Sequence, residues 1–148
     1  TREDWRKIFD LNLDAGYFLA QACGKEMNKV GGGRMVFVTS QRGISAMVNI
    51  APYCITKGAV MTMTKALAID LAQYNINVNG IAPGYVMTDM VAGLLAVKQR
   101  LPGVLDKTPL AKMGTIDEMA AAILYFCLPQ SSYTTGQTLI LDVGWSCQ

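Results

Sequence analysis

The chain has 148 residues, 51% of them apolar, and a formal net charge of +2 from 13 Lys and Arg against 11 Asp and Glu. This balance disfavours intrinsic disorder, and the net charge is too small to argue for nucleic acid or an anionic membrane, so we expect neither partner. The length suffices for one sizeable hydrophobic core, and we expect residues 1–148 to form a single domain.

Two residue counts restrict the chemistry. The chain has no histidine, which excludes a Ser-His-Asp triad, a Cys-His dyad and a His-ligated zinc site within it, and we expect no metal site. The four cysteines show no CxxC spacing and predict free, buried thiols in a reducing compartment, the cytoplasm. We also expect no signal peptide and no membrane-spanning helix, because no apolar core follows the first residues and the uncharged stretches are broken by Gly, Pro and Asn.

The first predicted elements are a helix and a strand. Apolar residues recur with helical spacing over about residues 1–28, and Thr1 and Asp4 form a capping pair at the start. Three glycines at 31–33 end this helix. Residues 34–39 are apolar and rich in β-formers, which predicts a buried strand.

The next elements repeat that order. A polar loop over residues 40–51 leads to a second helix over about residues 52–74, with Pro52 in its first turn. That helix is apolar on most faces, so we expect it to be covered on more than one side. Residues 75–82 predict a second strand, which the Pro83-Gly84 pair ends.

The last third adds one more helix and strand. A short helix is predicted around residues 91–100, and Thr115 with Glu118 forms a capping box for a third long helix that ends before Pro129. Residues 136–142 predict a third strand. Strands that alternate with full helices indicate the α/β class: a doubly wound, Rossmann-like parallel sheet covered on both faces, here its C-terminal part with three strands and three long helices.

Tyr53 and Lys57 form the strongest candidate for chemistry. Their spacing places both side chains on one helix face, one turn apart. A phenol ordinarily titrates near pH 10, and a neighbouring ammonium favours its phenolate form, which makes such a pair a proton donor and acceptor for an alcohol or carbonyl. The pair alone is a weak pattern. However, Ser40 follows the first strand directly and Pro83-Gly84 follows the second, at the sheet edge where open α/β folds bind ligands.

Five segments in this order resemble the short-chain dehydrogenase/reductase family. They are Leu11-Asn12-Leu13, Val36-Phe37-Val38-Thr39-Ser40, Tyr53-Cys54-Ile55-Thr56-Lys57-Gly58-Ala59, Val78-Asn79-Gly80-Ile81-Ala82-Pro83-Gly84 with Thr88, and Thr135-Gly136-Gln137-Thr138-Leu139-Ile140-Leu141-Asp142-Val143-Gly144. The resemblance covers nearly the whole chain. It departs from the family at Thr56, where Ser is common, and at Val143, where a second Gly is usual.

The resemblance implies hydride transfer between NAD or NADP and a small-molecule alcohol or carbonyl. Tyr53 would be the acid/base, Lys57 would assist its ionisation and hold the nicotinamide ribose, Ser40 would bind the substrate oxygen together with Tyr53, and Asn12 would position a water that relays protons to Lys57. The cofactor would also contact Pro83, Gly84, the Val86 backbone and the Thr88 hydroxyl.

Plainer interpretations stand beside these roles. Asn12 would satisfy a bent helix backbone, Ser40 would cap a loop, and Thr88 would cap the helix that follows. Trp145 and the methionines would serve packing or an interface.

The family's glycine-rich dinucleotide fingerprint and its strand have no counterpart in this sequence. We therefore expect the chain to be the C-terminal part of an active oxidoreductase whose N-terminal half lies outside it. A different class, a non-catalytic remnant that serves as an oligomerising or interaction module, is the alternative. A cofactor-free lyase such as a halohydrin dehalogenase is disfavoured, because that group has Arg where Lys57 stands. Charged residues make up 16% of the chain, against about 25% in an average domain, and family members commonly pair their helices across twofold axes, so we expect a homotetramer or homodimer.

Overall fold

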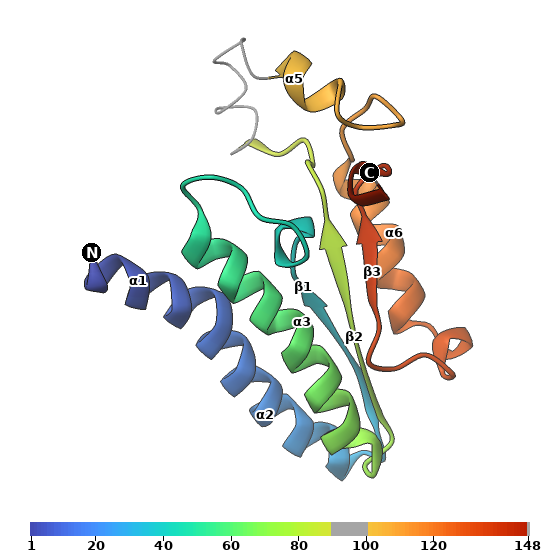
Figure 1. Ribbon diagram of the computed structural model, residues 1–148. Coiled ribbons are helices and arrows are strands. Elements are labelled where there is room, and N and C mark those ends of the chain that lie inside the picture. Colours follow the sequence, from blue (N-terminus) through green and yellow to red (C-terminus); the bar gives the residue numbers. More distant parts are fainter. Residues whose placement is uncertain (90–100, 148) are drawn as a thin grey trace.

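Three parallel strands form one sheet in the computed structural model, which describes residues 1–89 and 101–147 (Figure 1). The order is β1 (Gly33–Val38), β2 (Ile76–Pro83) and β3 (Thr138–Leu141), and both neighbouring pairs are parallel. Parallel neighbours require a crossover between them, and helices provide both crossovers. The predicted parallel α/β architecture is therefore confirmed.

Helices cover both faces of this sheet (Figure 1). On one face lie α1 (Arg2–Phe9), the π-helical turn η1 (Asp10–Asp14), α2 (Ala15–Lys29) and α3 (Ala51–Ala72). The other face is covered by α6 (Ile116–Cys127). A short helix, α5 (Leu101–Leu105), and the 3-10 turns η2 (Gln41–Gly43), η3 (Pro129–Ser131) and η4 (Trp145–Cys147) complete the described elements.

The hydrophobic core is divided by the sheet into two parts. Successive side chains of a strand point to opposite faces, so Met35 packs in the cluster beneath α2 and α3, whereas the next residue, Val36, packs in the cluster beneath α6. Phe126 of α6 and Ile81 of β2 are the largest members of the second cluster, and both are buried. β2 is buried along most of its length, and its one fully buried polar side chain, Asn79, is hydrogen-bonded to the backbone of Thr134 and Gln137.

Most predicted boundaries hold to within one or two residues. Both capping boxes, at Thr1 and at Thr115, form as predicted, and Pro52 lies in the first turn of α3. The first helix differs: it is interrupted at η1, where the Ala15 amide bonds to the Asp10 carbonyl oxygen five residues back. The short helix predicted around residues 91–100 falls outside the described residues.

The prediction of buried thiols is wrong, because none of the four cysteines is fully buried. All four are free, but Cys127 and Cys147 are exposed, and Cys23 and Cys54 are only half-buried. In α6, Ala122 and Phe126 face the sheet, and the residue after Phe126 is rotated about 100° away from it. Cys127 therefore points away from the sheet and is exposed at the surface.

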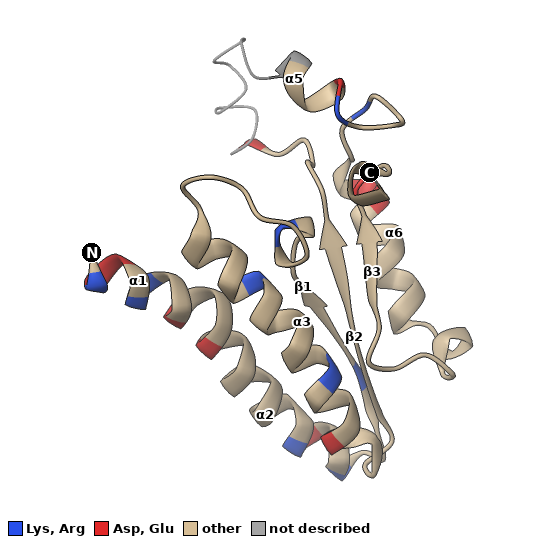
Figure 2. Ribbon diagram, viewed as in Figure 1, with Lys and Arg blue, Asp and Glu red and all other residues tan. Residues whose placement is uncertain are grey.

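Charge is unevenly distributed over the surface. Charged side chains gather on α1, on α2 and at the end of α3, whereas α6 has them only in its first turn (Figure 2). Large apolar side chains are also exposed on this side of the molecule, among them Leu11 of η1 (76% exposed), Phe18 of α2 (62%) and Ile69 of α3 (78%). Within the described part of the chain, no helix combines the length and the apolar character that spanning a membrane would need.

Candidate functional site

The predicted site residues converge at the carboxyl edge of the sheet. β1 ends immediately before Thr39 and Ser40, and β2 ends at Pro83, next to Gly84. The first turns of α3, which hold Tyr53 and Lys57, lie beside the segment that follows β1. Carboxyl ends of parallel strands share one edge, and ligands of open α/β sheets bind there.

The ammonium of Lys57 is held between a strand end and a phenol ring. Its Nζ donates to the carbonyl oxygen of Val38, the last residue of β1, at 3.1 Å. The same Nζ lies 5.7 Å from the centre of the Tyr53 ring, within the range of a cation–π contact. Burial lowers the pKa of Lys57 from its ordinary value. An ammonium has three N–H donors, so the bond to Val38 leaves donors for a second partner.

Ser40 stands on a turn that is packed tightly against α3. The Thr39 hydroxyl donates to the carbonyl oxygen of Lys57 at 2.7 Å. At Gly43, a Cβ would stand only 2.8 Å from that carbonyl oxygen, so only glycine allows this approach. Ser40 is buried, and its Oγ accepts from the backbone amide of Arg42 at 3.1 Å. That bond uses an oxygen lone pair, and the hydroxyl hydrogen stays free to be donated to a substrate oxygen.

Asn12 reaches the same part of α3 from the π-helical turn. Its Nδ2 donates to Oγ1 of Thr56 at 3.3 Å, and that fully buried hydroxyl donates to the backbone carbonyl of Tyr53 at 2.8 Å. Asn12 is thereby tied to the residue before Lys57. The helix is locally rewound where Asn12 stands.

The segment after β2 is joined to the rest of the edge by two short pairings. Gly84 donates to the Leu141 carbonyl at 2.8 Å and lies against the side chain of Gln41. Val86 forms an isolated parallel bridge with Gly114. The two bonds of that bridge come from the neighbours of Val86, so its own N–H and C=O point to the opposite side. Thr88, which is half-buried, lies two residues after Val86 in the same segment.

Three further residues at this edge were not among the predicted site residues. They are Arg42, Tyr85 and Trp145, which follow β1, β2 and β3 respectively, and Arg42 contacts both of the other two. The only sequence signal for them was an arginine placed two residues after Ser40 in an otherwise uncharged stretch from residue 35 to residue 56.

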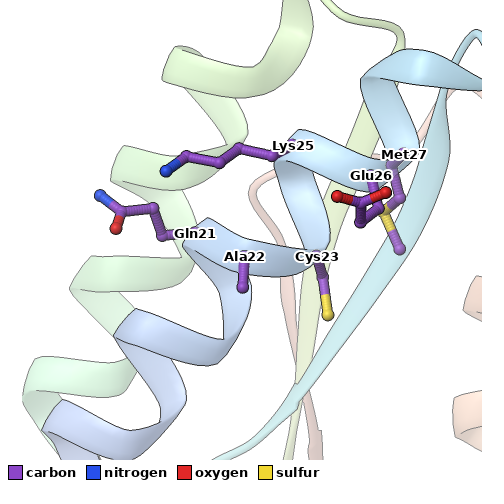
Figure 3. Close-up of a pocket in the computed structure, with 6 residues that line it drawn as sticks. All are labelled: Gln21, Ala22, Cys23, Lys25, Glu26 and Met27. Atoms are coloured by element: carbon purple, nitrogen blue, oxygen red, sulfur yellow. The ribbon is translucent and has the colours of Figure 1, made fainter.

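Two surface hollows lie away from this edge. One, of about 480 Å³, is lined by residues of a single helix, α2, from Gln21 to Met27 (Figure 3). Met27 packs against Gly33, the first residue of β1, so this hollow is near the amino end of that strand. The other, of about 760 Å³, is lined by residues of η1, α2 and α3 that include Tyr17, Phe18 and Leu67. Neither includes a predicted site residue.

Known proteins resemble the chain along its whole length. A family model described as "Enoyl-(Acyl carrier protein) reductase" matches residues 1–146. Gluconate 5-dehydrogenase of Gluconobacter oxydans is 34% identical over 144 residues, which are 97% of this chain and 56% of that protein. A tropinone reductase homolog of Arabidopsis thaliana is 35% identical over 146 residues, 99% of this chain and 55% of that protein.

A solved structure agrees closely with the fold. The gluconate 5-dehydrogenase from Burkholderia cenocepacia, crystallised in complex with NADP and tartrate, superposes with a TM-score of 0.96 at 33% identity. The superposition covers 100% of this chain and 58% of that one. The chain thus spans 55–58% of the length of these three proteins.

Proposed function

Because the chain belongs to the short-chain dehydrogenase/reductase family, we propose that it is the catalytic part of an NAD(P)-dependent oxidoreductase, which transfers hydride between the cofactor and an alcohol or carbonyl substrate. The observation that supports this most directly is the setting of Lys57. Its partly buried ammonium lies between the Val38 carbonyl oxygen and the Tyr53 ring. The preceding residue, Thr56, accepts a hydrogen bond from Asn12, and the turn that holds Ser40 packs on the Lys57 backbone.

The residues present fit a nicotinamide cofactor. Lys57 keeps N–H donors beyond the Val38 bond, which suits a pair of ribose hydroxyls. The backbone N–H and C=O of Val86, turned away from Gly114, suit the donor and acceptor of a carboxamide, and Thr88 would add its hydroxyl. Pro83 and Gly84 would form the wall beside the ring. The bound cofactor would supply the hydride acceptor or donor.

The proton chemistry falls to the chain's own side chains. In oxidation, the Tyr53 oxygen would take the proton of the substrate hydroxyl while the substrate carbon loses hydride; in reduction, it would return that proton to the carbonyl oxygen. Ser40, with its hydroxyl hydrogen not used by the cap, would donate to the same substrate oxygen and orient it. Asn12, held by Thr56, would position a water from which Lys57 exchanges its proton with solvent.

Assembly and compartment complete the proposal. Apolar side chains exposed on α1, α2 and α3, and the hollow that Tyr17 and Phe18 line, suit a homotetramer or homodimer that pairs these helices. The four free thiols suit a reducing compartment such as the cytoplasm. Light scattering of the full-length protein at micromolar concentration tests the assembly, and a monodisperse monomer would contradict it.

Substitution of Tyr53 tests the chemistry. In the full-length protein, Tyr53→Phe removes only the phenol oxygen, so we expect turnover to fall by at least 10²-fold, the lower end of what general acid–base catalysis contributes, with the affinity for NAD(P) little changed. Tyr74→Phe, an exposed tyrosine just beyond the end of α3, is the matched control. Activity of Tyr53→Phe within a few-fold of the parent would contradict the assignment. Absence of any NAD(P)-linked activity in the parent would favour the interaction module instead.

A further inference from the structure

A cluster of three side chains lies at the carboxyl edge of the described sheet. Arg42 is in the segment after β1, Tyr85 in the segment after β2 and Trp145 in the segment after β3. The Nη2 of Arg42 donates to the Tyr85 hydroxyl at 2.9 Å, and Nη1 donates to the Ala46 carbonyl at 3.4 Å. The guanidinium carbon lies 4.5 Å from the centre of the Trp145 ring. We define these three residues as the arginine cluster. It stands at the edge where Ser40 and Lys57 lie, and Arg42 shares the η2 turn that Ser40 caps.

The cation in this cluster is buried without an anion. Arg42 is only 8% exposed, and none of the ion pairs among residues 1–89 and 101–147 includes it. Its partners are a phenol, a carbonyl and aromatic rings, all of them neutral. Arginines are rarely this buried unless they are paired with an anion, because removing the charge from water is costly.

The acidic residue on the same edge is already engaged. Asp142 follows β3 and is buried, but its Oδ1 accepts from the Gly144 amide at 3.1 Å and its Oδ2 from the Ser146 amide at 2.9 Å. Both carboxylate oxygens therefore shape the turn before Trp145. The edge consequently offers two cations, Arg42 and Lys57, whose described hydrogen-bond partners are all uncharged.

Among residues 1–89 and 101–147, the hydrogen bonds given for the Arg42 guanidinium use only part of its donor capacity. A guanidinium has five N–H donors in one plane, of which two make the bonds given above. The contact with the Trp145 ring is a cation–π contact and supplies no oxygen acceptor to the remaining N–H groups. A planar fork of N–H groups matches a carboxylate, which accepts two parallel hydrogen bonds from it.

We propose that Arg42 binds a carboxylate of the substrate, so that the substrate class is the hydroxy or oxo carboxylic acids. This inference rests on the proposed oxidoreductase function and narrows it. Ser40 would hold the reacting oxygen while Arg42, two residues further along the same turn, holds the carboxylate. The substrate is thereby oriented at two points on one short, well-packed turn.

Matched substrate pairs test this in the full-length protein. Gluconate and glucitol, and likewise 3-hydroxybutyrate and 1,3-butanediol, differ by a carboxylate in place of a CH₂OH group. We expect kcat/KM to favour the acid of a productive pair by about 100-fold, the discrimination expected of a charge-assisted bidentate contact. Arg42→Met, which keeps most of the apolar stem, should lower kcat/KM for the acid by about that factor, mainly through KM, and change the value for the neutral partner less than threefold. Arg42→Lys should restore part of the preference.

Controls separate recognition from structural support. Arg34→Met is the matched control, because Arg34 lies at the amino end of β1, at the edge of the sheet opposite to Arg42. It should leave the acid preference unchanged. Equal losses for acid and neutral substrates in Arg42→Met, or a parent enzyme that prefers the neutral member, would overturn the proposal. Titration calorimetry with gluconate, 3-hydroxybutyrate and tartrate in the presence of NADP⁺ is independent of turnover. We expect the parent to bind at least one of these carboxylates and Arg42→Met to lose that binding.

Turnover and carboxylate binding together distinguish failure of the Arg42 proposal from failure of the proposed oxidoreductase function. If the protein turns over neutral alcohols with NAD(P) but binds no carboxylate, the oxidoreductase stands and the Arg42 proposal is overturned. If it has no NAD(P)-linked activity, the proposed function fails. In that case, carboxylate binding that is lost in Arg42→Met would still support the anion site at Arg42. A parent protein that binds no carboxylate would overturn the anion site as well.

Discussion

Gly43 sets the spacing between the turn that holds Ser40 and the helix that holds Tyr53 and Lys57. A Cβ at this position would stand 2.8 Å from the Lys57 carbonyl oxygen and 2.9 Å from its carbon, whereas ordinary van der Waals contact begins at 3.4 Å. Gly43→Ala therefore requires η2 and α3 to separate by about 0.6 Å. Overpacking of this kind typically costs about 1–3 kcal/mol of stability. Because misplacing catalytic groups by about 1 Å costs on the order of 10²-fold in rate, we expect turnover to fall roughly 10-fold.

Two other glycines provide a graded control series. Gly58→Ala meets a single backbone atom, the Gly43 oxygen, at 3.2 Å, so its losses should be smaller. At Gly16, in α2, a Cβ would have no neighbour closer than 3.8 Å, and Gly16→Ala should be neutral or stabilising by up to about 1 kcal/mol. Urea unfolding and steady-state turnover of the full-length variants give both quantities. A Gly43→Ala protein as stable and active as the parent would refute the reasoning.

Three further predictions concern the pH response, the cofactor wall and a helix cap. Burial lowers the pKa of Lys57, so the folded protein releases this proton at lower pH than the unfolded chain, and the parent should gain stability relative to Lys57→Met as the pH rises from 7 toward 10.5. Urea unfolding measures this difference, with Lys65→Met as the control for losing a lysine. A difference that does not depend on pH would contradict the prediction. Gly84→Ala places a Cβ 2.8 Å from the Cα of Asp142, and calorimetric titration with NADP⁺ should show roughly 10-fold weaker binding, whereas unchanged affinity would argue against a cofactor wall here. Thr115→Ala removes the cap of α6 and should cost about 1 kcal/mol in urea unfolding with turnover unchanged; no loss of stability would mean that the cap is dispensable.

Local patterns in the sequence determined the elements of this fold and part of its site. Helical and alternating periodicity depend on side-chain directions within one element, and these follow from backbone geometry alone. The capping boxes at Thr1 and Thr115 and the one-turn spacing of Tyr53 and Lys57 are of this kind, and the structure agrees with each. The parallel sheet followed from the alternation of strands and helices, because a strand that is followed by a helix returns in parallel.

Contacts between elements were decided only by the tertiary structure. Asn12 bonds to Thr56 across 44 residues, and Arg42 to Tyr85 across 43. No periodicity encodes such pairs, because they depend on how the surrounding elements pack. The π-helical turn at Asn12 was not predicted either, because a local change of backbone hydrogen bonding from the fourth residue to the fifth has no sequence signature of its own. The sequence by itself therefore identified the Tyr53–Lys57 pair, whereas the fold alone buried Arg42 at the same edge of the sheet with no ion-pair partner in the described part of the chain.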